Sequence, residues 1–273
     1  MKPVSLENMV DSPHLLIERE GAVVTVIMNR PSARNAMGLE MLARMADAWD
    51  SIDNDPSVRV AILTGAAGHF SSGADLKAMA TGHNDPVWAP RFQQDRDLHW
   101  KAFLRHYRLR KPLIAAVEGT CLAGGTEILQ ATDIRIAGEG AKFGISEARW
   151  GLFPLGGSTV RLRRQIPYCH AMEILLTGRH VPAREALDLG LINRVVADGQ
   201  ALACAREVAL QIAENGPVAV QAIKRSVLAT EGLPEAEALA LELQIGQQVF
   251  ESEDAKEGPA AFAAKRKPEF KGR

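Results

Sequence analysis

Two glutamates lie in segments whose residue types could support acid–base chemistry. Glu127 follows Gly124 and Gly125, and Glu147 follows the short segment at residues 143–146. A carboxyl group can give a proton to a reacting carbon or take one from a water molecule. The pair therefore indicates a site for general acid–base catalysis, provided that the fold brings the two side chains together. A single glutamate is more commonly a solvated surface residue.

Glycine-bearing loops near these residues could supply backbone N–H donors. Residues 111–133 run from an apolar, β-branched segment through two glycines into a helix-like run that carries Glu127. The first turn of a helix has N–H groups without intrahelical partners, and these can bind a substrate oxygen. The same order of strand, glycine loop and helix occurs at residues 58–79, with Asp75 in or next to the first helical turn. Glycine after a strand usually only forms a turn, but two such loops with two carboxylates could hold an oxyanion while protons move.

The composition is ordinary for a soluble globular protein. The chain has 273 residues, of which 47% are hydrophobic, so it can bury a substantial core as one large domain or two small ones. Its 32 basic and 33 acidic side chains give a net charge of −1, so no overall charge attracts nucleic acid or an anionic membrane. The first residues lack the apolar run of a signal peptide, and no stretch approaches the roughly 18 apolar residues of a membrane span.

Other well-known site motifs are missing from the sequence. The cysteines, Cys121, Cys169 and Cys204, have neither CxxC spacing nor an even count, which disfavours a disulfide framework or a zinc site and fits a reducing cytoplasm. The seven histidines show no HExxH spacing, so a metal site is not expected. Without a GxSxG elbow or a complete GxGxxG fingerprint, an ordinary α/β-hydrolase or a Rossmann dehydrogenase is disfavoured as well.

The hydrophobic pattern predicts alternating strands and helices up to about residue 200, and mostly helices afterwards. Two β-branched segments at residues 15–19 and 23–28 predict a hairpin, and the apolar stripe over residues 39–54 predicts an amphipathic helix. Residues 81–90 look irregular, and residues 91–109 predict one basic, aromatic-bearing helix. Further helices are expected at residues 158–165, 168–177, 182–189, 201–214, 217–230 and 234–251. This order favours a layered α/β core followed by a helical C-terminal segment.

Several segments, in order along the chain, resemble the crotonase superfamily and specifically its enoyl-CoA hydratases, most of all those of actinobacteria. The matching segments are NRPSARNAM at 29–37, FSSGADLKAM at 70–79, KPLIAAVEG and AGGTEILQATDIRIA within 111–137, FGISEARWGLFPLGG at 143–157, and LTGRHVPAREALDLGLINRVV at 176–196. The resemblance implies an α/β fold with a spiral of repeated ββα units in residues 1–200, which would hold the active site. It implies a helical region in residues 201–273 that joins chains into homotrimers or homohexamers. The implied substrate is an acyl-CoA thioester, with no metal or redox cofactor.

The same resemblance gives roles to particular residues. The backbone N–H groups of Ser72 and Gly124 would form an oxyanion hole for the thioester carbonyl. Glu127 would act as the base toward the water that attacks C3, and Glu147 would deliver a proton to C2. Residues expected near CoA are Arg30, Ala33, Ala36, Ala74, Asp75, Lys77, Phe262 and Lys265, the last two reaching the CoA of a neighbouring subunit.

Departures from the family pattern bear on the substrate. Ala123 stands where many hydratases have glycine, Ser146 replaces a frequent proline, and Trp150 adds bulk just after the second glutamate. The insert at residues 83–90, with Trp88, would lie near the acyl pocket. A pocket formed by residues 81–109 and Trp150 would then select the acyl group, which we expect to be bulkier than a short linear chain.

Two alternatives to hydration remain open at this point. The chain could have another crotonase activity, such as that of an enoyl-CoA isomerase or a carnitinyl-CoA-type dehydratase. It could also be a non-catalytic trimer that binds acyl-CoA. The presence of both glutamates favours hydration, because binding alone needs neither of them.

Overall fold

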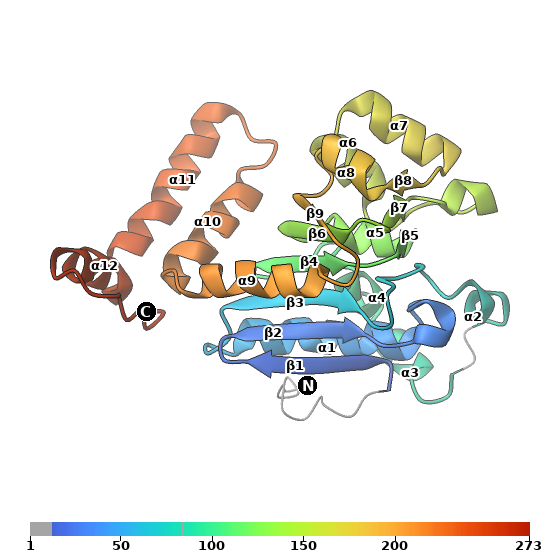
Figure 1. The fold of residues 1–273 in the computed structure, drawn as a ribbon, viewed down its shortest axis with the longest axis horizontal. Coiled ribbons are helices and arrows are strands. Elements are labelled where there is room, and N and C mark those ends of the chain that lie inside the picture. The colour runs from blue at the N-terminus through green and yellow to red at the C-terminus, as the bar shows by residue number, and fades with distance from the viewer. Residues whose placement is uncertain (1–12, 83–84) are drawn as a thin grey trace.

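A six-stranded sheet forms the centre of the computed structural model, which describes residues 13–82 and 85–273. The antiparallel hairpin predicted at the N-terminus is confirmed, and the other four strands continue the sheet in parallel (Figure 1). In spatial order the strands are β1 (Leu15–Glu20), β2 (Val23–Met28), β3 (Val60–Gly65), β4 (Leu113–Val117), β6 (Ile134–Gly138) and β9 (Arg194–Val196).

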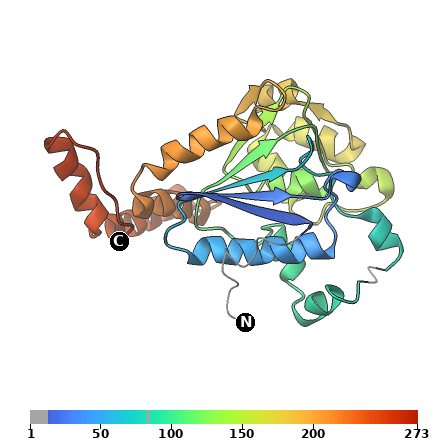
Figure 2. The ribbon, with the colours of Figure 1, turned by 60° about the horizontal axis from the view of Figure 1, so that its bottom comes forward.

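Two long helices cover opposite faces of this sheet (Figure 2). The predicted helix over residues 39–54 is confirmed as α1 (Leu39–Asn54), and it packs on β1 and β2. Helix α9 (Ala201–Ala213) packs against β2, β3, β4, β6 and β9 on the other face. Alternate side chains of each strand point to opposite faces, so Ala61 and Leu63 belong to the core beneath α1, whereas Val60 and Ile62 contact the α9 side.

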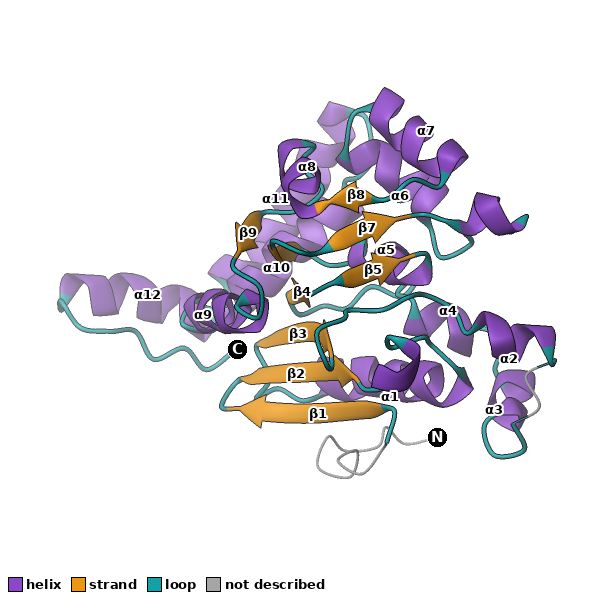
Figure 3. Ribbon diagram, turned by 45° about the vertical axis from the view of Figure 1, so that its right-hand side comes forward, coloured by secondary structure: helices purple, strands orange, loops and turns teal. Residues whose placement is uncertain are grey.

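A second, smaller sheet lies beside the first (Figure 3). It contains β5 (Thr120–Leu122), β7 (Lys142–Gly144) and β8 (Val181–Pro182). The chain passes from β4 in the large sheet to β5 in the small one, and then from β6 to β7 in the same way. Successive turns of chain therefore stack side by side as a spiral, and the turn that follows each pair of strands falls at the same end of the molecule.

Buried polar contacts hold the start of β4 against the end of α1. The ammonium group of Lys111 donates to the carbonyl of Ile52 at 2.6 Å and to that of Asp55. The last carbonyls of a helix lack intrahelical partners, so this buried cation satisfies them. Burial lowers the pKa of Lys111 to about 8 in spite of the nearby charges of Asp53 and Asp55.

The C-terminal helices after α9 project away from the sheets (Figure 1). The predicted helices are confirmed as α10 (Pro217–Ala229) and α11 (Glu235–Phe250), and a further helix, α12 (Glu253–Ala263), was not predicted. Large apolar side chains remain exposed on this arm: Ile223, Val227, Leu239, Leu243, Phe250 and Phe262. None of the helices in the described ranges is long and apolar enough to cross a bilayer.

The prediction of a single helix over residues 91–109 is wrong. Two short helices occupy this region, α3 (Ala89–Gln94) and α4 (Leu98–Ala102). Between them the side chain of Asp95 accepts a hydrogen bond from the N–H of Asp97 at 2.9 Å. A local side-chain bond of this kind offers the backbone an alternative to helix, and Leu104 then takes a left-handed conformation (φ 51°) that ends the segment.

The short helices that precede α9 in the sequence fall close to the expected positions. Two of them, at residues 158–165 and 168–177, have the predicted bounds. These elements are α2 (Leu76–Ala80), α5 (Gly124–Leu129), α6 (Ser158–Gln165), α7 (Tyr168–Thr177), α8 (Ala183–Asp188) and the 3₁₀ turns Pro31–Ala33 and Glu147–Trp150.

Candidate active site

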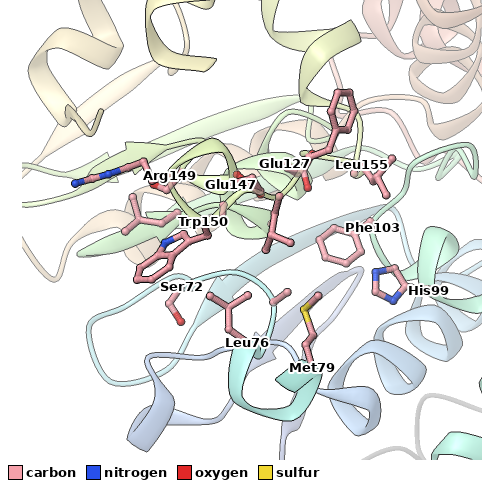
Figure 4. A pocket seen from close by; sticks show the side chains of 18 of the residues that line it. Ser72, Leu76, Met79, His99, Phe103, Glu127, Glu147, Arg149, Trp150 and Leu155 are labelled. Carbon is pink, nitrogen blue, oxygen red and sulfur yellow. The ribbon is translucent and has the colours of Figure 1, made fainter. Parts of the chain in front are cut away.

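A cavity of about 780 Å³ opens where the turns of the spiral end (Figure 4). Its walls come from the loop before α2, from α4, from the first turn of α5 and from residues 146–156. Most of the lining is apolar, with two carboxyl groups, Glu127 and Glu147, side by side at its centre. Apolar walls with a few convergent polar groups are typical of a binding or catalytic site. The lining side chains include Leu76, Met79, His99, Trp100, Phe103, Arg149, Trp150, Leu152, Phe153, Leu155 and His180.

Glu127 lies on α5 and is only 5% exposed. Its carboxylate accepts a long hydrogen bond, 3.4 Å, from the N–H of Ser158 at the start of α6. A Cβ atom at Gly156 would stand 2.6 Å from the other carboxylate oxygen, so only glycine fits beside it. Burial raises the pKa of Glu127, although the hydrogen bonds from Ser158 and Gly156 oppose the shift.

Glu147 begins the 3₁₀ turn Glu147–Trp150 and has a different environment. Its Oε2 atom is buried and has no hydrogen-bond partner within the described part of the chain. Burial, together with repulsion by the charge of Glu127, raises the pKa of Glu147 to about 7. A buried, unpaired carboxyl oxygen is costly for folding alone, so Glu147 is a candidate functional residue rather than one placed for stability.

The first turn of α5 presents a free backbone donor to the cavity. Ala123 precedes the helix with φ 50° and ψ −125°, and its own N–H donates to the carbonyl of Gly144 at 2.7 Å. The next N–H, that of Gly124, has no hydrogen-bond partner among the residues described. The loop before α2 lies directly against it, because a Cβ atom built on Gly73 would be 2.9 Å from the Gly124 nitrogen.

The prediction that Ser72 supplies a backbone donor is contradicted by the geometry of this loop. The N–H of Ser72 donates to the carbonyl of Arg34 at 2.9 Å, and its hydroxyl donates to the carbonyl of Ala33 at 3.0 Å. Ser72 still lines the cavity, but its N–H is already used. The nearest alternative is Ala74, two residues further along the chain.

Ala74 pairs with Met37 in a single parallel bridge that leaves its own N–H free. Met37 donates to the carbonyl of Gly73 at 2.8 Å, and the N–H of Asp75 donates back to Met37 at 3.2 Å. In such a bridge the middle residue points its N–H away from the partner strand. The Ala74 N–H has no hydrogen-bond partner in residues 13–82 or 85–273, and Ala74 lines the cavity with Gly124.

The residues expected near CoA from the first half of the chain lie together at one edge of the cavity. Arg30 forms an ion pair with Asp75 at 2.5 Å, and Asp75 in turn accepts from the N–H of Lys77 at 3.1 Å as the N-cap of α2. Burial alone would raise the pKa of Asp75, but the hydrogen bond and charge of Arg30, together with the N–H groups of Lys77 and Ala78, lower this pKa overall. Ala33 and Ala36 join the same corner through their carbonyls, which accept from Ser72 and Arg30.

Phe262 and Lys265 lie elsewhere in this single chain. They stand at the end of α12, on the arm that extends away from the sheets (Figure 1). The Phe262 side chain is 87% exposed, and neither residue lines the cavity. The structure of one chain therefore does not bring them to the other expected CoA contacts.

Several cavity residues were not singled out from the sequence. Aromatic residues near position 100 were expected in the pocket as a group, and Trp100 and Phe103 do line it. Trp150 was also expected there and lines the cavity. His180 was missed because no motif surrounds it; its Nε2 lies 3.4 Å from the hydroxyl of Ser146.

The expectation for Trp88 is wrong, because this ring does not line the cavity. It packs instead against the core, with the guanidinium of Arg44 at 5.1 Å from the ring centre. Residues 83–84 of the same insert lie outside the described residues.

The spiral of paired strands is the α/β crotonase fold. A family model described as enoyl-CoA hydratase/isomerase matches residues 18–273, and the chain belongs to this family.

Individual relatives agree with this assignment. The chain is 56% identical over 266 residues to enoyl-CoA hydratase EchA19 of Mycobacterium tuberculosis, covering 96% of this chain and 97% of that protein. It is 40% identical over 270 residues to a carnitinyl-CoA dehydratase of Proteus mirabilis, covering 96% and 100%. The crystal structure of enoyl-CoA hydratase EchA1 from Mycobacterium marinum superposes with a TM-score of 0.88 at 41% identity, covering 96% of this chain and 100% of that one.

Proposed function

We propose that this protein is an enoyl-CoA hydratase that adds water across the double bond of a trans-2-enoyl-CoA to give a 3-hydroxyacyl-CoA. The observation that carries the proposal is a pair of carboxyl groups, the buried Glu127 and the partly buried Glu147, in one apolar cavity. Beside them are two backbone donors without a hydrogen-bond partner in the described residues. A binding protein would need neither carboxyl group. The 56% identity to a protein named as an enoyl-CoA hydratase supports the same reaction.

The backbone donors would hold the thioester oxygen. When water adds at C3, negative charge moves onto this oxygen, and N–H groups already aimed at it stabilise the enolate-like transition state. We assign this role to the N–H groups of Ala74 and Gly124, because both are free and the loops that carry them touch. Loss of one such donor typically lowers the rate by about 10²–10³.

The two glutamates would then transfer the protons. In its ionised form Glu127 takes a proton from the water as the oxygen bonds to C3. In its protonated form Glu147 gives a proton to C2, and its pKa of about 7 keeps this form available near neutral pH. The turnover leaves Glu127 protonated and Glu147 ionised, and one proton exchange with water restores the starting state.

A panel of enoyl-CoA substrates tests this function. Purified protein is mixed with crotonyl-CoA and with longer and branched enoyl-CoAs, and loss of the conjugated double bond is followed by absorbance. We expect turnover that falls by about 10²–10⁴ in Glu127→Gln and in Glu147→Gln while acyl-CoA still binds. Glu20→Gln, on an exposed strand end, serves as the control with unchanged activity. The absence of turnover on every substrate would refute the proposal.

Dehydration is the second candidate reaction. The relative from Proteus mirabilis is named as a carnitinyl-CoA dehydratase, and the same two carboxyl groups can remove water from a 3-hydroxyacyl-CoA. Incubation with carnitinyl-CoA beside crotonyl-CoA separates the two. A higher kcat/KM for carnitinyl-CoA would favour the dehydratase.

We also propose that residues 201–273 serve assembly of a homotrimer, alone or as half of a hexamer, in the cytoplasm. The arm formed by α10, α11 and α12 exposes apolar side chains that a neighbouring chain would cover, and exposed apolar surface of this kind marks interaction sites. Helix α9 packs on the sheet of its own chain, so the arm beyond it is the part free to reach a neighbour. Light scattering of the intact chain measures the number of subunits.

A further inference from the structure

One wall of the cavity is a short apolar loop between two left-handed glycines. Gly151 (φ 66°) and Gly157 (φ 121°) bound this segment, and glycine adopts such angles without strain. Leu152, Phe153 and Leu155 line the cavity from it, yet each is 40–63% exposed. Side chains that line a cavity and still face solvent form a wall that a bulky substrate can displace.

Arg105 connects this loop to the opposite wall. Its Nε donates to the carbonyl of Leu155 at 2.8 Å, and its guanidinium lies over the ring of Trp100, 5.3 Å from the centroid. Trp100 lines the cavity from α4, whereas Arg105 stays outside. A single side chain thus holds the apolar loop against α4.

Arg105 is itself held in place by a buried arginine. Arg161 on α6 donates through Nη2 to the carbonyl of Leu104 at 2.5 Å and to that of Arg105 at 2.8 Å. The N–H of Arg105 also donates to the carbonyl of Trp100 at 2.9 Å. These three bonds fix the backbone from which the Arg105 side chain reaches Leu155.

The Arg105–Leu155 hydrogen bond lies on the side of the glutamates where the acyl chain of the substrate would extend. Gly156 abuts the carboxylate of Glu127, so the C-terminal end of the loop lies where the reacting carbons of the substrate would be. Phe103 and Leu155 lie on one side of the glutamates, whereas Ser72 and Trp150 lie on the other (Figure 4). The expected CoA contacts Arg30 and Ala33 are joined to the Ser72 side. An acyl chain beyond C3 would therefore pass between α4 and the loop that Arg105 holds.

We propose that Arg105 is a specificity-determining residue that limits the size of the acyl group. This inference rests on the proposed hydratase function. A chain too long or too wide for the closed cavity must push residues 152–155 outward, and this movement breaks the Arg105–Leu155 hydrogen bond. Short acyl groups leave the bond intact.

The test compares substrate preference in Arg105→Ala, Arg105→Lys and the wild type. The measured quantity is the ratio of kcat/KM for dodecenoyl-CoA to kcat/KM for butenoyl-CoA. A hydrogen bond from a charged donor is worth about a tenfold change in an equilibrium, so the ratio should rise about tenfold in Arg105→Ala. Lysine keeps the charge but lacks the fixed Nε donor, so Arg105→Lys should shift the ratio in the same direction by less, and it serves as the readout should the alanine variant not fold. Arg163→Ala, an exposed position on α6, is the matched control with an unchanged ratio.

Binding measurements separate this inference from the proposed function. Calorimetry with the saturated esters dodecanoyl-CoA and butanoyl-CoA needs no turnover, and the affinity ratio should shift in the same direction as the kinetic ratio. If the wild type hydrates enoyl-CoAs and the ratio in Arg105→Ala equals that in Arg163→Ala, the role of Arg105 is refuted. If no enoyl-CoA is turned over but the binding ratio shifts, the hydratase proposal fails and the role of Arg105 in acyl selection stands.

Discussion

The carboxyl group of Glu147 lies close enough to that of Glu127 for their negative charges to repel each other. Burial, together with this repulsion, raises the pKa of Glu147 to about 7, and burial also raises the pKa of Glu127. Two interacting buried acids lose their protons in two separate steps. The protonated form of Glu147 is therefore still present near neutral pH, as its proposed role as a proton donor requires.

The pH dependence of hydration should report this pair. If Glu147 must be protonated to donate, kcat/KM for crotonyl-CoA decreases as the pH rises above about 7. On the acid side kcat/KM decreases as Glu127 takes up a proton. Initial rates measured between about pH 5 and pH 9 check both limbs. A rate that stays constant through neutral and alkaline pH would contradict the role of Glu147 as acid.

The free energy of unfolding should also depend on pH through Glu147, and Glu147→Gln should abolish this contribution. The pKa of Glu147 is higher in the folded chain than its ordinary value of 4.5, so the folded state holds a proton that the unfolded state releases between about pH 4.5 and pH 7. The ionised carboxylate destabilises the fold above this window, and the effect vanishes below it. Glu147→Gln should therefore be more stable than the wild type by about 3 kcal/mol near pH 8 and equal to it near pH 4.

Urea denaturation at the two pH values measures this difference in the free energy of unfolding. Glu20→Gln, at an exposed strand end, is the control and should show no such change with pH. Equal effects of Glu147→Gln at both pH values would mean that this carboxyl group is not strained by burial.

Gly73→Ala should move the backbone N–H of Ala74 away from that of Gly124. Gly73 has φ 94°, and a Cβ atom there would be 2.7 Å from the Cβ of Ala123 and 2.9 Å from the nitrogen of Gly124. Because this contact pushes the loop of Ala74 away from Gly124, we expect kcat/KM to fall by about 10²-fold. Steady-state kinetics with crotonyl-CoA measures the loss.

Gly190→Ala is the matched control for this variant. Gly190 is also left-handed (φ 78°), but a Cβ atom there would meet nothing within 4 Å. The Gly190→Ala variant should lose about 1 kcal/mol of stability and keep its kinetics unchanged. Similar activity in the two variants would show that contact between the loops is irrelevant to the reaction.

Phe262→Ala and Lys265→Ala should raise KM for CoA esters without unfolding the chain. Phe262 is 87% exposed in the single chain, so its removal loses little internal packing. If these residues reach the CoA of a neighbouring subunit, KM should rise by about tenfold, equivalent to about 1.4 kcal/mol. Lys267→Ala, whose side chain is 93% exposed, is the control. Unchanged KM in an intact oligomer would remove the arm from the CoA site.

The sequence predicts this fold well wherever one period dominates a segment. The apolar stripe of α1 and the bounds of α6 and α7 agree with the structure because each helix buries a single continuous face. Residues 91–109 fail because the bond from Asp97 to Asp95 interrupts a pattern that is helical on average. The spacing of hydrophobic residues gives no information about local hydrogen bonds of this kind.

The side chains of the candidate site could be predicted from the sequence, but its free backbone N–H groups could not. Glu127 and Glu147 are recognisable because their side chains carry the chemistry. Which N–H in the loop before α2 is free depends on Arg34, a residue far earlier in the chain whose carbonyl takes the N–H of Ser72. His180 lines the cavity for a similar reason, since only the folding of the second sheet brings it there.

The N–H donors of Ala74 and Gly124, which have no partner in the described part of the chain, belong to the main chain, whereas the two acids are side chains. No single substitution, other than one to proline, deletes a backbone N–H group. One exchanged side chain removes either glutamate. In the proposed mechanism, the capacity to polarise a carbonyl is thus protected against most point mutations, while the proton transfers can be altered by changing one codon.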